Sequence, residues 1–509
     1  MTEQRKNYYE ELIDNMMIEG IKGMNDAETA SLKAYLRASD TKTKRAKILA
    51  VLVDNNTDKR KLFSEIQKTE QKYNEIKDYK MSSTKHIQNV IKMLREYVDF
   101  GDVEIKTMGE VMTPIFLVEE MLDQLPDNVW TNPDLKWLDP CNGAGIFVSI
   151  IVQRLLKGLV NFEPDEELRY KHIMENMIYV GELQPKNMFL YLYAFDPQDK
   201  LDLNIYCGSY LTSEFDLHMK EVYGVEKFDI VVMNPPYQEL KEGNTKSQAI
   251  WNLFVKKALE TSLVADGYLV AVHPSGWRDI DGALKKIQLL LKSRQMLYLE
   301  IHNEKDGLKT FGAETRYDFY CVRNTENHGN FNTKIKCQDG SIERADLSKM
   351  EFIPNAMFDI FNKLIAKKNE KTVEIMYSRT AYGNDKPNIS RIANDEFKYP
   401  VIYTVKNADV LTFLYSSTNK NGHFGTPKLI WSTGRIISVG SYVDATGEYG
   451  LTNFSHAIVD DVNVLDKIKQ AFDSKAFRAL MEACSVSFMS INRKVIATFR
   501  KDFWIDFLK

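Results

Sequence analysis

The chain has 509 residues, enough for two or three domains, and 44% of them are hydrophobic, so it can bury sizeable cores. With 27% charged residues and a formal net charge of −4, it is neither a disordered tail nor a protein coated in positive charge, although local basic grooves stay compatible with this balance. Five widely separated cysteines favour reduced thiols over a disulfide framework or a zinc site. The N-terminus lacks a signal peptide and no apolar run could cross a bilayer, so we expect a cytoplasmic protein without a membrane partner.

The first region, residues 1–105, contains no proline and is rich in charged and amide residues. We expect a helical N-terminal domain here, because apolar residues recur at helical spacing after a Ser82-Ser83-Thr84 start signal, namely at Ile87, Val90, Ile91, Leu94 and Val98. Asn25 and Glu28 resemble a capping box of an earlier helix. Glu70 and Lys72 have a minimal nuclease spacing, but chance explains it better in a charged helical stretch without a strand. We interpret this region as non-catalytic, serving dimerisation or DNA contact.

The second region, residues 106–328, alternates short apolar strands with amphipathic helices, which predicts a mostly parallel sheet covered on both faces. Seven strands are expected, at 136–138, 177–180, 204–206, 228–233, 268–272, 296–301 and 318–322. The third region, 329–509, loses this alternation and carries turn signals, aromatic residues and scattered basic residues, which favours a separate α+β domain.

A glycine-rich turn follows the first of these strands, in the stretch from Trp137 to Phe147. Gly143 and Gly145 let the backbone approach a ligand, and the helix that follows offers unpaired amides. A tight turn without a ligand and a Rossmann-type NAD site share this outline. Asp139 precedes the glycines and can accept from a cationic ligand such as the amino acid part of S-adenosylmethionine, which shifts the interpretation away from NAD. Glu182, after the second strand, suits the hydroxyls of any ribose-bearing cofactor.

The tetrapeptide Asn234-Pro235-Pro236-Tyr237 follows the apolar strand 228–233. The prolines end the strand and stiffen the backbone around Asn234. Asn234 and the Pro235 carbonyl can accept the two hydrogens of an exocyclic amine, while Tyr237 stacks on a planar ring. Direct transfer from a sulfonium needs positioning above all, so neither a strong general base nor a metal is required. A strand that merely ends in a proline turn is the alternative, and the glycine turn about ninety residues earlier disfavours it.

At these residues the sequence resembles the amino-methyltransferases of DNA, in the group whose order is cofactor motif, catalytic NPPY, target-recognition domain. The resemblance implies a Rossmann-like seven-stranded methyltransferase domain, S-adenosylmethionine as cofactor and adenine N6 as target. It also implies cofactor roles for Asp139, Gly143, Gly145 and Glu182. The upstream stretch from Gly109 to Phe116 looks like the family's first cofactor motif, in which the residues that border the cofactor are Thr113, Pro114 and Phe116.

Ser209 departs from the family pattern, whereas Phe311 agrees with it. Ser209 stands where the family usually has an acid that contacts the cofactor's adenine, so a hydroxyl or a backbone group would have to replace it. Phe311 aligns with an aromatic residue that packs the flipped target base, with a core phenylalanine as the alternative.

The C-terminal region resembles, more weakly, the recognition domains of bifunctional restriction–modification enzymes, which implies double-stranded DNA as partner. Our candidates for DNA contact are Lys428, Arg435, Arg493 and Lys494, although each single basic residue is more often a solvated surface charge. A second copy of the chain or a restriction subunit are further candidate partners. The competing interpretations are an RNA or protein-glutamine methyltransferase, both of which also use NPPY, and a relative that binds DNA without catalysis.

Overall fold

The computed structural model describes residues 82–99, 113–196, 200–240, 247–280, 282–377, 386–406, 410–420, 423–434, 436, 439–486 and 491–508. Within these ranges, every helix is too short or too polar to serve as a membrane span. The chain forms two compact units: residues up to 274 together with 289–334, and residues 275–288 together with 335–509. The capping box expected at Asn25 and the pair Glu70 and Lys72 lie outside the described residues. The boundaries of the three domains expected from the sequence stay predictions.

The first unit is built on a parallel-rich sheet, in whose nine-stranded order the consecutive strands β8-β9-β7-β4-β1-β2-β3 belong to this unit. Its strands are β1 (Trp137–Asp139), β2 (Ile178–Glu182), β3 (Asn204–Cys207), β4 (Phe228–Met233), β7 (Leu263–Pro274), β8 (Arg294–His302) and β9 (Tyr317–Glu326). β9 runs antiparallel to both of its neighbours, β7 and β8, whereas the pairs from β7 to β3 are parallel. All seven strands expected from the apolar runs are therefore confirmed. They share one sheet in a unit of mixed α/β class, as expected.

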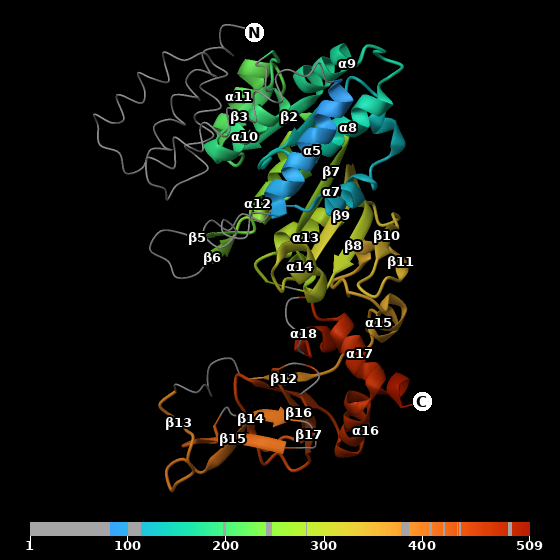
Figure 1. The fold of residues 1–509 in the computed structure, drawn as a ribbon. Helices are drawn as coiled ribbons and strands as arrows, with labels where there is room; N and C mark the ends of the chain where they lie inside the picture. The colour runs from blue at the N-terminus through green and yellow to red at the C-terminus, as the bar shows by residue number, and fades with distance from the viewer. Residues whose placement is uncertain are drawn as a thin grey trace, which may run out of the picture. The chain divides into compact units, whose positions relative to one another are not determined.

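Helices cover both faces of this sheet (Figure 1). Their bounds are α5 (Ser83–Asp99), α7 (Ile115–Leu122), α8 (Ile146–Gly158), α9 (Glu166–His172), α10 (Pro185–Phe195), α11 (Ser213–Tyr223), α12 (Trp251–Lys257) and α14 (Glu304–Phe311). Figure 1 shows α5 beside α8, and both contribute to one hydrophobic core with Ile230 and Val232 of β4. Tyr179 points to the opposite face, where its ring contacts Tyr223 of α11 at 6.1 Å. The helical spacing after Ser82 is thus confirmed as α5.

A short hairpin of β5 (Gln238–Leu240) and β6 (Ser247–Ala249) follows β4 directly. The sequence did not predict it, because the residues that form the two strands show no apolar alternation and include no β-branched residue. α13 (Lys285–Lys292) and β10 (Thr333–Lys336) each run across the division between the two units.

The second unit contains two small four-stranded sheets, β12-β19-β16-β17 and β13-β15-β14-β18. Side chains of both sheets share one core that includes Ile402, Ile430 and Leu451. The strands of this unit are β11 (Ile342–Ala345), β12 (Ile375–Tyr377), β13 (Ile389–Ser390), β14 (Tyr399–Lys406), β15 (Val410–Ser416), β16 (Lys428–Ser432), β17 (Ser441–Asp444), β18 (Gly450–Leu451) and β19 (Ser455–Val459). Its helices are α15 (Phe358–Leu364), α16 (Val462–Asp473), α17 (Lys475–Ala483) and α18 (Arg493–Ile496).

Candidate active site

The two motifs singled out in the sequence follow neighbouring parallel strands. β1 pairs with β4 through Trp137 opposite Ile230 and Leu138 opposite Val231. From β1 the strand order proceeds through β2 to β3 on one side and resumes with β4 on the other, so the order reverses between β1 and β4. Ligands of open α/β sheets bind at the carboxyl ends of strands at such a reversal. The glycine turn after β1 and the Asn234 loop after β4 both lie at this edge.

The glycine turn takes a conformation that side chains rarely allow. Gly143 and Gly145 have φ angles of +55° and +97°. A Cβ atom on Gly145 would lie 2.6 Å from the Phe195 ring and 2.9 Å from the Tyr191 ring, so α8 starts close against α10 only because this residue has no side chain. A Cβ on Gly143 would meet nothing within 4 Å, which leaves space beside the turn.

Glu182 connects the turn to the loops after β2 and β3. Its carboxylate accepts hydrogen bonds from the amides of Gly143 and Gln184, each at 2.7 Å, and its carbonyl accepts from Gly208 N at 2.8 Å. Because a carboxylate has about four acceptor sites, these bonds are compatible with a further hydroxyl donor. Glu182 therefore shapes the turn and could also contact a ligand.

Asp139 is a buried carboxyl group without a cation beside it among the described residues. Its side chain is 2% exposed, Oδ1 accepts from Cys141 N at 3.2 Å, and Oδ2 has no hydrogen-bond partner in the described part of the chain. Burial raises the pKa of Asp139 to about 8; the Cys141 amide opposes this rise and the charge of Glu182 adds to it. A cationic ligand would stabilise the carboxylate form, so the site has the electrostatics of a cation acceptor.

The Asn234 side chain is held from the upstream motif. Its Nδ2 donates to Thr113 Oγ1 at 2.9 Å, and Thr113 is itself 5% exposed. This bond orients the amide, with its nitrogen toward Thr113 and its oxygen turned the other way. Pro114 precedes α7 in an extended conformation, and Phe116 within α7 is 46% exposed. The structure thus brings the upstream motif and the tetrapeptide together.

An aromatic wall lies beside the tetrapeptide. The rings of Tyr237 and Phe311 meet edge to face, with centroids 6.4 Å apart, and Phe311 contacts Tyr317 at 4.9 Å. Pro235 is buried and Pro236 exposed. Phe311 is placed by α14, which starts at a capping box between Asn303 and Asp306 and ends at Gly312 in the left-handed conformation.

Ser209 closes a turn rather than presenting a strong acceptor. It is half-buried, its Oγ accepts from Leu211 N at 3.3 Å, and its carbonyl accepts from Thr212 N at 3.3 Å. Its contact with a cofactor stays a prediction.

Three residues at this edge were missed in the sequence. Burial raises the pKa of the Cys141 thiol well above its ordinary value, so this cysteine is a neutral packing residue rather than a nucleophile. The buried Asn142 Oδ1 has no hydrogen-bond partner among the described residues. Leu183, directly after Glu182, is 66% exposed. A position beside a strand-end acid is the only sequence signal that could have indicated Leu183.

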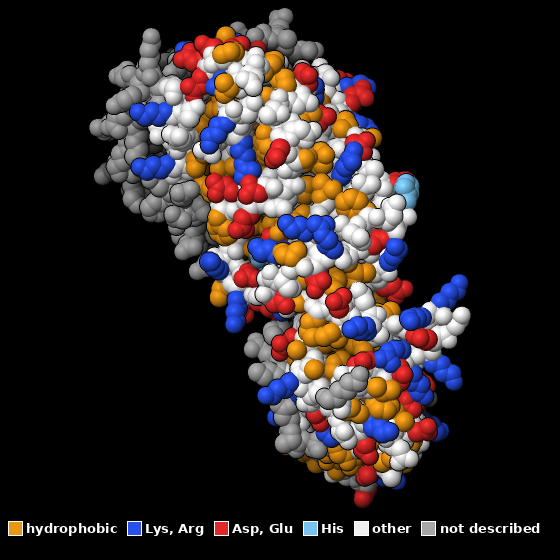
Figure 2. Space-filling view, turned by 90° about the vertical axis from the view of Figure 1, so that its right-hand side faces the viewer, with side chains coloured by type: hydrophobic (Ala, Val, Ile, Leu, Met, Phe, Trp, Pro, Cys, Tyr) orange, Lys and Arg blue, Asp and Glu red, His pale blue; other side chains and the backbone are white. Residues whose placement is uncertain are grey.

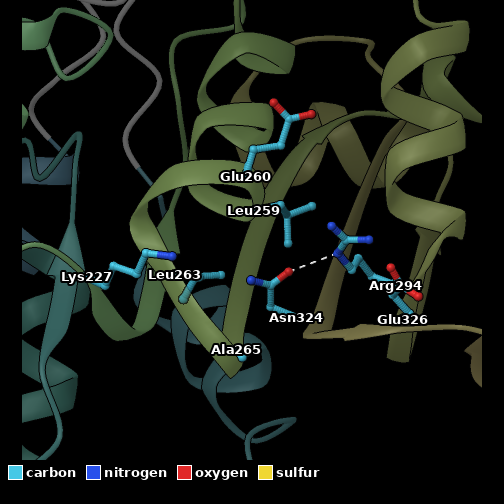
Figure 3. Close-up of a pocket in the computed structure, with 8 residues that line it drawn as sticks. All are labelled: Lys227, Leu259, Glu260, Leu263, Ala265, Arg294, Asn324 and Glu326. Atoms are coloured by element: carbon cyan, nitrogen blue, oxygen red, sulfur yellow. Dashed lines mark hydrogen bonds between the residues drawn. The ribbon is translucent and has the colours of Figure 1, made fainter.

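A pocket of about 350 Å³ lies at the opposite edge of the sheet, where the parallel strands begin (Figure 3). It is lined by Lys227, Leu259, Glu260, Leu263, Ala265, Arg294, Asn324 and Glu326. Arg294 Nε donates to Asn324 Oδ1 at 3.0 Å, as Figure 3 shows, so these two polar groups satisfy each other. The pocket is separate from the strand ends that carry the motifs.

The candidate residues for DNA contact lie in different environments where the structure describes them. Lys428 is fully buried, and its ammonium donates to Asp444 Oδ2 at 2.8 Å and to Thr426 O at 3.1 Å. The expectation that Lys428 contacts DNA is therefore wrong, because a buried, paired ammonium cannot reach a phosphate. Arg435 lies outside the described residues. Arg493 and Lys494 are half-buried, with the Arg493 guanidinium 3.7 Å from the centre of the Tyr377 ring, and their DNA contacts stay predictions.

Figure 2 shows one face of the molecule, on which basic and acidic side chains are intermixed with hydrophobic ones. No single band of positive charge crosses that face among the described residues. This agrees with the nearly balanced net charge and gives no separate support to a DNA surface there.

Sequence comparison shows similarity to a family of methylases and to a bacterial methylase. Residues 152–307, which include the tetrapeptide, match the model of the family described as "Eco57I restriction-modification methylase". An "Uncharacterized adenine-specific methylase" of Mycoplasma pneumoniae (strain ATCC 29342 / M129 / Subtype 1) is 30% identical over an alignment of 237 residues, and the match covers 33% of this chain and 55% of the relative. The chain thus spans about half the length of the curated relative that it matches.

Among solved structures, a nuclease-deletion mutant of the type ISP restriction-modification enzyme LlaGI with a DNA substrate mimic gives a TM-score of 0.48 at 12% identity, covering 94% of this chain and 64% of that one. A DrdV–DNA complex gives 0.47 at 11% identity, covering 97% and 70%. By its sequence, the part of the chain that carries the Asn234–Tyr237 loop is similar to the Eco57I restriction-modification methylases, and about a third of the chain is similar to an adenine-specific methylase.

Proposed function

We propose that this chain transfers a methyl group from S-adenosylmethionine to the N6 amine of an adenine in double-stranded DNA, as the methylase of a restriction–modification system. The observation that carries the proposal is the Asn234 amide, held by Thr113 at the end of β4 beside the Asp139 and Glu182 carboxylates at the ends of β1 and β2. The match of residues 152–307 to restriction-modification methylases supports it.

The groups at the strand ends fit the proposed cofactor. The buried carboxyl of Asp139 suits an ammonium, Glu182 suits ribose hydroxyls, and Phe116 and Leu183 offer exposed apolar side chains to a purine. The partnerless Asp139 Oδ2 and Asn142 Oδ1 are buried acceptors that a ligand would satisfy, among the residues described. When bound, S-adenosylmethionine supplies an electrophilic methyl group on a sulfonium.

The chain's own part is to hold and orient the target amine. The Asn234 amide oxygen and the Pro235 carbonyl accept its two hydrogens, which keeps the nitrogen lone pair available for attack. Tyr237 offers its ring to the base, and an adenine in a duplex must leave the stack to reach it. Phe311 is 5% exposed and belongs to the hydrophobic core, so it supports the Tyr237 ring edge to face. Burial raises the pKa of Tyr237, so its hydroxyl stays protonated.

The raised pKa of Asp139 predicts pH-dependent cofactor affinity. Below pH 8 the free protein holds this carboxyl protonated, and an ammonium ligand requires its ionisation, so the affinity rises with pH. Between pH 6 and 7, where an α-amine of pKa about 7.7–8.0 stays protonated, we expect about tenfold tighter binding. Calorimetric titration with S-adenosylhomocysteine measures this, and Asp139→Asn should bind weakly with little pH dependence. If the affinity of the parent and of Asp139→Asn depended equally on pH, the assignment of Asp139 to the ligand's ammonium would be contradicted.

The experiment that tests the function offers three acceptors to the full chain. Labelled S-adenosylmethionine is incubated with unmethylated DNA, total RNA and ribosomal protein, and we expect label in DNA as N6-methyladenine. Label in RNA or in protein alone would identify one of the competing methyltransferases. No label in any fraction, despite cofactor binding, would identify a relative that has lost catalysis.

A further inference from the structure

A second set of aromatic side chains, Trp251, His273 and Tyr320, lies next to the point where the chain returns from the Asn234–Tyr237 loop. The chain leaves β4 at Asn234, forms the β5–β6 hairpin and returns at Ile250, whose amide donates to the Tyr237 carbonyl at 3.2 Å. The next residue, Trp251, is 2% exposed and stacks on the imidazole of His273, with ring centroids 3.7 Å apart and planes at 14°. The loop is therefore attached to the sheet at both ends, by β4 and by Trp251.

His273 is held in one orientation. It lies near the end of β7, is fully buried, and its Nδ1 lies 3.1 Å from the Pro274 carbonyl, which can only accept a hydrogen bond. Burial lowers the pKa of His273 to about 3, so the ring is neutral. Nδ1 therefore carries the proton, and Nε2 accepts from the Tyr320 hydroxyl at 2.8 Å.

Each contact in this series is made by a different element. Tyr320 lies on β9, His273 on β7, Trp251 at the start of α12, and Tyr237 after β4. The register of β4 and β7, in which Met233 pairs with Ala271, places the His273 end of β7 beside the start of the loop. The Tyr320 hydroxyl thus holds the His273 ring, and this ring stacks on Trp251. Trp251 directly follows Ile250, whose amide closes the loop through its hydrogen bond to the Tyr237 carbonyl.

We propose that Trp251, His273 and Tyr320 position the Asn234–Tyr237 loop for the transfer step, without touching the substrate. The inference rests on the proposed function for its kinetic part. A displacement of about 1 Å in such a loop can reduce a rate on the order of a hundredfold, whereas the glycine turn and the Asp139 and Glu182 carboxylates lie on other elements and keep their geometry.

The test compares His273→Ala, His273→Phe and Tyr320→Phe in the full chain. We expect His273→Ala to reduce kcat about a hundredfold and Tyr320→Phe roughly threefold to tenfold, with sinefungin affinity within about twofold of the parent. His273→Phe keeps a flat ring against Trp251 and should recover most of kcat. His172→Ala is the matched control, because that histidine also packs in this unit, against Phe162 and the Pro133 carbonyl, and should leave kcat unchanged.

Amide hydrogen exchange supplies a readout that needs no substrate. If the stack positions the loop, the Ile250 amide exchanges faster in His273→Ala and not in His172→Ala. Unchanged Ile250 exchange together with parallel losses of kcat, sinefungin affinity and Tm would reduce His273 to a structural residue and overturn the proposal. Unchanged kcat in His273→Ala would overturn it as well. Should the parent protein methylate no DNA, the proposed function fails while the Ile250 exchange still decides the positioning role.

Discussion

We expect replacement of Asn234 with alanine to reduce the kcat of the proposed methyl transfer by at least about a thousandfold, while cofactor affinity stays within about twofold of the parent. The expected loss is large because the proposed role of the Asn234 side chain is to hydrogen-bond and orient the target amine, and removal of one such group typically costs a factor of about 100 to 1,000 even where others remain. Cofactor binding is spared because Asp139, Gly143 and Glu182 lie on β1, the turn after it and β2. Single-turnover transfer and calorimetry measure the two quantities.

Thr113→Val is the graded companion to Asn234→Ala. It removes the hydroxyl that accepts from Asn234 Nδ2 at 2.9 Å and keeps the size of the side chain. The amide remains but loses its fixed orientation, so we expect kcat to fall about tenfold. Transfer at the parent rate by Asn234→Ala would refute the assigned role, and a larger loss in Thr113→Val than in Asn234→Ala would move that role to Thr113.

The sheet and the edge that carries the site were predictable because both depend on local signals. An apolar run as short as Phe228–Met233 favours a buried strand over a helix, and Pro235 and Pro236 determine where it ends. Since parallel strands meet with their carboxyl ends at one edge, residues after β1, β2 and β4 had to gather there. The glycine and NPPY motifs therefore located the candidate site without knowledge of the tertiary contacts.

The stack behind the loop depends on tertiary contacts that the sequence does not display. Trp251, His273 and Tyr320 are separated by up to 69 positions and meet only through the order of β4, β7 and β9. His273 stands at the end of an apolar run, where a polar residue would ordinarily indicate the approach to solvent, yet it is fully buried. The pairing of its ring nitrogens with a hydroxyl and a carbonyl makes that burial favourable.

Lys428 shows why the roles of single basic residues were the hardest feature of the site to predict from the sequence. A lysine at the start of a strand near glycine turns suggests a surface charge, because lysine is almost never fully buried unless it is paired. Its partner, Asp444, comes 16 residues later at the end of the neighbouring strand, where Lys428 and Asp444 face each other in the β16–β17 pairing. That register, set by the sheet, turns a predicted DNA contact into a structural ion pair.

The same ion pair gives the largest stability effect that we expect. Lys428→Met leaves the Asp444 carboxylate buried without its cation, at a cost of about 3–5 kcal/mol in the free energy of unfolding. Asp444 also accepts from the amides of Glu448 at 2.9 Å and Tyr449 at 3.0 Å, so the milder variant must retain an acceptor. Lys428→Met combined with Asp444→Asn removes the buried charge and keeps one acceptor oxygen, for one of the two amides, and should recover part of the loss.

Urea unfolding followed by hydrogen exchange of the β16 and β17 amides measures the change in the second unit, with Lys406→Met as the control at an exposed strand end. We expect the control within about 0.5 kcal/mol of the parent. A phosphate contact would behave in the opposite way, because losing it lowers DNA affinity and its salt dependence while stability stays unchanged. Parent-like stability in Lys428→Met with weakened DNA binding would restore Lys428 as a DNA contact, whereas destabilisation rescued by Asp444→Asn assigns it to the core of the second unit.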